Sequence, residues 1–234
     1  MRLLAIETAT PGSSVTLAEG RDAVAYAARV DRTGHSEFLV PAIDFCFDQA
    51  GWSPADLDGI VVDVGPGLYT GLRVGVATAQ GLGATLGIPV IPVVSLDALA
   101  LDAATGRRHI WAVIDVRRGE VAFSTYWPVP GGVVRDGAPD LVDLAGLRAR
   151  LESNPSDTLV VGDFPVLPED TLRGLHRVKT GRPRYPSARA VAEIGAGRFE
   201  RDEIPHPDEI RPLYLREPDV TINWEKLHQA GPWG

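Results

Sequence analysis

The sequence predicts an α/β fold, in which buried strands alternate with helices. Residues 3–6 and 59–64 are almost entirely apolar, as expected of strands in a sheet that is covered on both faces. Residues 36–50 carry a wide apolar helical face, and residues 71–87 follow a glycine-rich loop as a second helix. This alternation of strands and helices is typical of α/β proteins.

Turn and cap residues bound each element in the first hundred residues. Ser36 and Ser95 are predicted to cap helices, and Gly87 predicts the end of one. Pro41 is expected to bend the first helix or to delay its start. In order, the predicted elements are strands over 3–6, 14–17 and 23–29, a helix over 36–50, a helical turn from Ser53-Pro54, a strand over 59–64, a helix over 71–87, a strand over 88–94 and a helix from Ser95.

The rest of the chain predicts a second lobe on the same plan. An apolar strand that ends in Asp115 leads through a tight turn into another strand, as the strand that ends in Glu7 does at the start. We expect one lobe over residues 1–103, completed by about 187–234, and a smaller lobe over 104–186. The predicted elements of the smaller lobe are strands over 109–116 and 120–127, a loop-rich region over 128–140, a helix from Asp143 to Leu151, and strands over 158–161 and 175–179. A helix capped by Ser187 and a tail that is ordered in part follow this lobe.

The composition excludes several classes of protein. The 234 residues carry a formal net charge of -8, which argues against an autonomous nucleic-acid binder, because such proteins contact phosphates with Lys and Arg. Cys46 is the single cysteine, so a disulfide within the chain is not available. Residues 74–96 carry no charge, but their glycines and prolines indicate core elements rather than a membrane span. We expect a cytoplasmic protein with no membrane partner.

A glycine-rich loop between a buried strand and a helix is the most distinctive segment. Free N–H groups and the helix dipole favour an anion at such a position. The candidate residues for an anion-binding or nucleotide-proximal loop are Gly65, Gly67, Thr70 and Arg73. The loop lacks the Gly-Lys-Ser/Thr ending of a Walker A motif. A tight connection without a ligand explains the same residues equally well.

The helix after this loop carries small residues at every fourth position. They are Gly71, Gly75, Ala79, Gly83 and Gly87, and they define one face of the helix. Each interior glycine costs about 1 kcal/mol relative to alanine, so the pattern requires the close approach of another backbone. That backbone belongs either to the chain's own sheet or to a second chain, and the sequence leaves both alternatives open.

No set of residues points to catalysis or to a metal. The five histidines are scattered, and no two of them have the spacing of a helical metal pair. Glu7 stands at the end of the first strand, where actin-like ATPases keep an acidic residue. A stand-alone actin-like ATPase or phosphotransferase, with Glu7, Thr8, Thr10 and the loop holding Mg-ATP, is the alternative function. We predict no catalytic residues, no metal and no resident cofactor.

Several motifs together resemble the TsaB (YeaZ) family. They are Leu3-Leu4-Ala5-Ile6-Glu7-Thr8-Ala9-Thr10, Gly34-His35-Ser36-Glu37-Phe38-Leu39-Val40-Pro41 and Gly65-Pro66-Gly67-Leu68-Tyr69-Thr70-Gly71-Leu72-Arg73. The resemblance covers essentially the whole chain. It implies a truncated, two-lobed actin-like (Hsp70/sugar-kinase/actin, ASKHA) fold. It also implies a non-catalytic subunit that activates TsaD, the threonylcarbamoyltransferase that modifies tRNA adenosine-37 to N6-threonylcarbamoyladenosine.

The same resemblance implies the partners. The contact with TsaD uses the helices over 36–50 and 71–87, and the residues expected there are Phe38, Leu39, Ala42, Ile43, Gly71, Leu72, Gly75, Ala79 and Gly83. The ATPase subunit TsaE acts alongside, the chain forms a homodimer when alone, and tRNA is contacted only indirectly. A nucleotide at the junction with TsaD is left open.

Two positions separate the chain from its catalytic relative. TsaD holds its metal with a His-x-x-x-His pair after the strand equivalent to 88–94, and the matching residues here are Ser95 and Leu99. Neither side chain replaces an imidazole ligand. The peptidase label attached to the wider family fails on the same residues. The chain also has Glu7 where the TsaB family usually has Asp.

Overall fold

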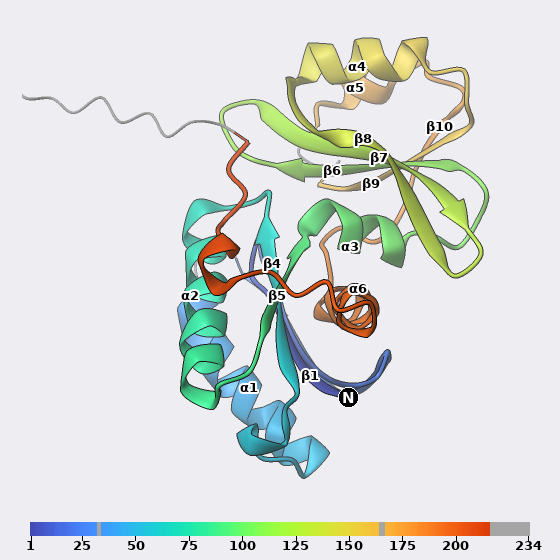
Figure 1. The fold of residues 1–234 in the computed structure, drawn as a ribbon. Coiled ribbons are helices and arrows are strands. Elements are labelled where there is room, and N and C mark those ends of the chain that lie inside the picture. Colours follow the sequence, from blue (N-terminus) through green and yellow to red (C-terminus); the bar gives the residue numbers. More distant parts are fainter. Residues whose placement is uncertain (32–33, 164–166, 216–234) are drawn as a thin grey trace, which may run out of the picture.

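The computed structural model describes residues 1–31, 34–163 and 167–215 and contains two five-stranded sheets (Figure 1). The strand order is β3-β2-β1-β4-β5 in the first sheet and β8-β7-β6-β9-β10, read from the opposite edge, in the second. In both sheets the first strand pairs antiparallel with the second and parallel with the fourth in chain order. The two lobes therefore share one topology, as the sequence echo predicted.

The first sheet lies between two layers of helices. Its strands are β1 (Arg2–Glu7), β2 (Gly12–Glu19), β3 (Asp22–Val30), β4 (Gly59–Gly65) and β5 (Val90–Val94). Helices α1 (His35–Ala50) and α2 (Tyr69–Leu86) pack on one face around Leu4, Ile6 and Val62. Helix α6 (Ala188–Glu200) packs on the other face around Leu3, Ala5 and Val61. This three-layer arrangement explains the nearly continuous apolar sequences of β1 and β4.

The second sheet is covered in the same way. Its strands are β6 (His109–Asp115), β7 (Glu120–Val129), β8 (Gly132–Asp143), β9 (Thr158–Gly162) and β10 (Val178–Thr180). Helix α3 (Ser95–Asp102) packs against Ile110, Ala112 and Ile114 and lies between the two sheets in Figure 1. On the opposite face, α4 (Leu144–Ser153) packs against Trp111, Val113 and Val160, and the short α5 (Glu169–Leu172) lies beside it.

The boundaries of the two lobes stay a prediction, although α6 returns to the first sheet as the predicted division requires. The part of the predicted 187–234 segment beyond Leu215, including the tail after Trp224, lies outside the described residues. Short 3-10 turns lie at Pro54–Asp56 and at Pro207–Glu209. No helix in the part of the chain that the structure describes has the length and hydrophobicity to span a bilayer.

The structure corrects one region and two boundaries. The predicted loop over 128–140 is instead the β7–β8 hairpin, whose turn uses Gly131 and Gly132 at positive φ. Pro139 is compatible with β8 because β8 is an edge strand, where a missing N–H costs no ladder hydrogen bond. Pro41 lies inside α1 and does not delay its start, and β10 is shorter than predicted.

Of the four predicted helix caps, two are confirmed and two are wrong. The confirmed caps are Asp143 and Ser187, and the wrong ones are Ser36 and Ser95. The side chains of Asp143 and Ser187 accept hydrogen bonds from the backbone N–H groups of Gly146 and Ala190. Ser36 does not cap α1, because that helix starts one residue earlier, after Gly34. Ser95 is the first residue of α3 and its hydroxyl donates to Asp63 instead.

This difference predicts opposite results for two similar substitutions. Ser187→Ala is expected to lower the free energy of unfolding by about 1 kcal/mol, because the Ala190 N–H loses its acceptor. Ser36→Ala is expected to change it by less than about 0.5 kcal/mol, because Ser36 is exposed and caps nothing. Urea unfolding of both variants measures the difference, and equal losses would contradict the cap assignment.

Candidate functional site

The glycine-rich loop between β4 and α2 is packed against the chain's own first hairpin. A Cβ at Gly67 would lie 2.1 Å from the carbonyl oxygen of Ala9, and the Leu68 N–H donates to that oxygen at 2.6 Å. The hydroxyl of Thr8 donates to the Gly71 carbonyl at 2.8 Å. A phosphate at this loop would need open space and free N–H groups. The Ala9 carbonyl occupies part of that space and accepts the Leu68 N–H. This packing favours a tight connection over a phosphate-binding loop.

The small residues of α2 face the chain's own sheet. A Cβ at Gly71 would lie 2.0 Å from the carbonyl oxygen of Thr8, and one at Gly75 would lie 2.4 Å from the Thr8 hydroxyl. At Gly83 it would lie 2.5 Å from Val90, and Ala79 is fully buried. The close approach that the spacing predicted is therefore made inside the chain. These four residues are not accessible to a second chain in this structure.

The other residues predicted at the partner contact are also core residues. Leu39, Ala42, Ile43 and Leu72 are buried, and Phe38 is partly buried against the same core. Their apolar character is explained by the sheet beneath α1 and α2. The residue-level prediction of the interface stays a prediction, although the helix faces chosen for their apolar or small residues pack inward in this chain.

The outward face of α2 is unusual for a surface helix because it also carries a row of small residues. Ala77, Gly81 and Ala84 are exposed at spacings of four and three residues, which places them on one face. Among the described residues, no atom lies within 4 Å of where a Cβ at Gly81 would be. Nothing in that part of the chain accounts for a glycine there, at a cost of about 1 kcal/mol in helix stability. On the neighbouring helix, Val40 and Phe45 are exposed apolar residues.

Thr70 and Arg73, the polar candidates of the loop, lie on the surface at the start of α2. The Arg73 guanidinium lies 4.0 Å from the ring centroid of Tyr69, and its Nε donates to the Tyr214 hydroxyl at 3.3 Å. The Tyr69 and Tyr214 rings stack at 5.5 Å. Gly65, by contrast, is buried and has positive φ. The structure thus divides the four candidates into two groups. Gly65 and Gly67 lie in the packed loop, and Thr70 and Arg73 lie at the exposed start of α2.

Two buried carboxyl groups lie beneath the loop. Glu7 and Asp63 end neighbouring parallel strands, since Ile6 pairs with Val62. Burial, with a smaller contribution from the charge of Asp63, raises the pKa of Glu7 well above its usual value. Burial raises the pKa of Asp63 to about 7, although hydrogen bonds from Ser95 and Gly65 oppose the rise. Sequence analysis singled out Glu7 but not Asp63.

The contacts of this pair leave one oxygen of each group without a partner. Glu7 Oε1 accepts from the Ala9 N–H at 2.9 Å. Asp63 Oδ1 accepts from the Ser95 hydroxyl at 2.5 Å and from the Gly65 N–H at 2.8 Å. Oε2 of Glu7 and Oδ2 of Asp63 are buried and accept no hydrogen bond from the described residues. Two buried carboxylates cannot both ionise cheaply, so the arrangement favours protonation of the pair below about pH 7.

The positions that match the metal ligands of TsaD have other roles here. Ser95 is fully buried on Asp63, and Leu99 is fully buried between α3 and the second sheet. Within residues 1–31, 34–163 and 167–215, no group of three or more His, Cys, Asp or Glu side chains is arranged to hold a metal ion.

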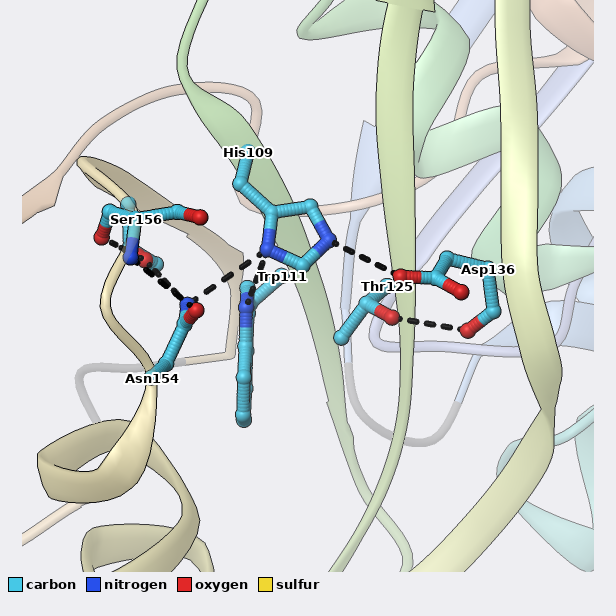
Figure 2. A network of polar contacts seen from close by, with 7 residues as sticks. His109, Trp111, Thr125, Asp136, Asn154 and Ser156 are labelled. Carbon is cyan, nitrogen blue, oxygen red and sulfur yellow. Dashed lines mark hydrogen bonds and ion pairs between the residues drawn. The ribbon is translucent and has the colours of Figure 1, made fainter.

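A second polar network, around His109, was not predicted (Figure 2). Trp111 Nε1 donates to Nδ1 of His109 at 3.3 Å, and Asn154 Nδ2 lies 3.4 Å from the same nitrogen. The ring stacks on the half-exposed Trp127 at 4.1 Å. Burial lowers the pKa of His109, so the imidazole is neutral and joins β6 to the β7–β8 hairpin. Trp127 and Asn154 are far from His109 in the sequence, and only the fold brings them to its ring. The spacing of residues in the sequence therefore does not reveal this network.

Comparisons with known proteins agree with the fold. The family model described as "TsaD: tRNA N6-adenosine threonylcarbamoyltransferase" matches residues 29–145, half of the chain. An uncharacterized protein of Mycobacterium tuberculosis is 35% identical over 220 residues, which cover 93% of each protein. The tRNA threonylcarbamoyladenosine biosynthesis protein TsaB of Escherichia coli is 28% identical over 97% of this chain and 98% of its own length.

The solved structure of YeaZ from Pseudomonas aeruginosa superposes with a TM-score of 0.77 at 25% identity, over 91% of this chain and all of that one. The chain belongs to the TsaB (YeaZ) family. That family takes part in tRNA threonylcarbamoyladenosine biosynthesis. The resemblance identified from the three motifs is confirmed.

The actin-like fold expected of the family is confirmed as well. The activator of 2-hydroxyisocaproyl-CoA dehydratase from Clostridium difficile shares it, with a TM-score of 0.52 at 10% identity over 87% of this chain and 96% of that one. At this identity the similarity concerns the fold alone. The match of the TsaD model to residues 29–145 spans α1, the glycine-rich loop and α2.

Proposed function

We propose that the chain is a non-catalytic subunit that binds TsaD and stabilises its active conformation during tRNA modification. Membership of the TsaB family and the match to the TsaD model support a place in this pathway. The observation that carries the proposal is the outward face of α2, where Ala77, Gly81 and Ala84 leave room for the close approach of another helix. On α1, Val40 and Phe45 are exposed apolar residues.

This docking face replaces the one predicted from the sequence. It uses the same two helices but their solvent-facing residues: Val40, Phe45, Ala77, Gly81 and Ala84. Docking changes the activity of TsaD by favouring one of its conformations, so no residue of this chain needs to reach the reacting atoms. We expect TsaE to act alongside, a second copy to occupy the same face when TsaD is missing, and tRNA to be held mainly by the partners, in keeping with the charge of -8.

Substitutions on this face test the proposal. Ala77→Arg and Gly81→Leu are expected to weaken the affinity for TsaD at least about tenfold, because each fills space that a partner helix would occupy. Both positions are exposed, so the fold is expected to tolerate the larger side chains. Isothermal titration calorimetry with the TsaD of the same organism measures the affinity.

Val134→Asp is the matched control. Val134 is an exposed apolar residue of β8, in the second sheet, and its replacement is expected to leave the affinity unchanged. Normal binding of TsaD by both α2 variants would contradict the docking face. Turnover of Mg-ATP by the isolated chain would favour the alternative of a stand-alone ATPase and contradict a non-catalytic subunit.

A further inference from the structure

The last described residues cross from α6 to α2 and close over the start of that helix. Figure 1 shows this red segment leaving α6, passing beside β4 and β5 and reaching α2. We call residues 210–214 the C-terminal strap. Ile210 is 3% exposed and joins the core under α1 and α2. Its carbonyl oxygen accepts a hydrogen bond from Gln80 Nε2 at 3.1 Å, which fixes the strap to the middle of α2.

A second contact fixes the strap to the glycine-rich loop. The Leu213 N–H donates to the Val64 carbonyl at 2.6 Å, which joins the strap to the last residues of β4. The Leu213 carbonyl oxygen lies 3.1 Å from where a Cβ at Gly65 would be. The strap therefore covers the loop as well as the helix, and a side chain at position 65 would push it away.

The third contact is made by Tyr214 on the first turn of α2. Its ring stacks on Tyr69, and its hydroxyl accepts a hydrogen bond from Arg73, whose guanidinium lies over the Tyr69 ring. The three side chains therefore restrict one another, although Tyr69 and Tyr214 are 52% and 39% exposed. Without Tyr214, the long Arg73 side chain would keep one aromatic neighbour and regain rotamer freedom.

Arg73 adjoins the proposed docking face. It precedes Ala77 and Gly81 at intervals of four residues, so it ends the row of small residues on the outward side of α2. A cation that is already held in one geometry loses less entropy when a partner binds. We propose that the C-terminal strap positions Tyr69 and Arg73 for binding of TsaD, with Tyr214 as the positioning residue. This inference rests on the proposed function.

Affinity measurements on four variants test the positioning role. Tyr214→Ala is expected to weaken the binding of TsaD about tenfold with little change in melting temperature, since Tyr214 lies on the surface. Tyr214→Phe keeps the stack on Tyr69 but loses the hydrogen bond from Arg73, so it is expected to recover only part of the affinity. Because Tyr214 acts through Arg73, the double variant Arg73→Ala/Tyr214→Ala is expected to bind no more weakly than Arg73→Ala alone.

Tyr26→Ala is the matched control. Tyr26 is also 39% exposed and also lies beside an arginine, Arg189, but it is on β3. Its replacement is expected to leave the affinity for TsaD unchanged. Wild-type affinity in Tyr214→Ala would overturn the proposal. Additive losses in the double variant would also overturn it, because they would mean that Tyr214 contacts TsaD directly.

Amide hydrogen exchange on the isolated chain separates this proposal from the proposed function. Tyr214→Ala is expected to speed exchange in residues 69–73 relative to the wild type, whether or not TsaD binds. Faster exchange together with no binding of TsaD by the wild type would reject the proposed function alone. Unchanged exchange together with normal binding by the wild type would reject the strap alone.

Discussion

Replacing Gly71 by alanine is expected to destabilise the protein by about 3 kcal/mol, the upper part of the usual range for overpacking a core. The added Cβ would lie 2.0 Å from the Thr8 carbonyl oxygen, which belongs to the backbone and has no rotamer to move into. Moving α2 outward would also break the hydrogen bond from the Thr8 hydroxyl to the Gly71 carbonyl. The loss exceeds the gain of about 1 kcal/mol that alanine brings to a helix interior.

Gly81→Ala on the same helix is the control. No atom of the described residues lies within 4 Å of the added Cβ, so this variant is expected to gain about 1 kcal/mol in the free energy of unfolding. Urea unfolding of both variants, with the wild type, measures the difference of about 4 kcal/mol that these two effects produce. If the two variants were equally stable, Gly71 would not be packed against the first hairpin, and the inward direction of the stripe would be wrong.

These two glycines show why the direction of the stripe could not be predicted. A spacing of four residues defines a face of a helix, but it does not say which surface covers that face. The sequence therefore predicted the close approach at Gly71, Gly75 and Gly83 correctly and left its partner open. The outward row was missed because Ala77, Gly81 and Ala84 repeat less regularly.

Short sequence patterns predicted a helix cap correctly where the donor and the acceptor lie a few residues apart. Asp143 and Ser187 bond to N–H groups three residues later, so short sequence patterns suffice to identify them. Ser95 has the same pattern, but its hydroxyl bonds to Asp63, 32 residues earlier in the chain. That acceptor is placed by the parallel pairing of β4 with β5, which local sequence does not encode. The pairing of Glu7 with Asp63 was missed for the same reason.

The stability of the protein is expected to fall as the pH rises from about 4 to about 7, because of the buried carboxyl pair. Burial raises the pKa of Asp63 from 3.8 in the unfolded chain to about 7. Between these values the native state binds more protons than the unfolded state, so the slope of stability against pH is negative. The difference between these two pKa values corresponds to roughly 4 kcal/mol in the free energy of unfolding. This contribution to stability is fully present below pH 4 and is lost above pH 7. The raised pKa of Glu7 acts in the same direction.

Asp63→Asn isolates this effect from the other titrating groups. The amide oxygen is expected to keep the hydrogen bonds from the Ser95 hydroxyl and the Gly65 N–H, and the amide nitrogen takes the place of Oδ2, which accepts no bond in the wild type. Since asparagine cannot ionise, the variant is expected to be more stable than the wild type at pH 8, by a few kcal/mol. Its stability is also expected to vary less between pH 4 and pH 7.

Chemical unfolding at pH 4.5, 6 and 8 measures both quantities. Asp48→Asn, at an exposed carboxylate of α1, is the control and is expected to leave the pH dependence of the wild type intact. A wild-type protein whose stability increased between pH 4.5 and pH 8 would show that the pair ionises without penalty. The two carboxyl groups would then have to be hydrated or neutralised by a bound cation. A protonated pair needs neither, which is why a fully buried Glu7 and Asp63 are compatible with a folded lobe at neutral pH.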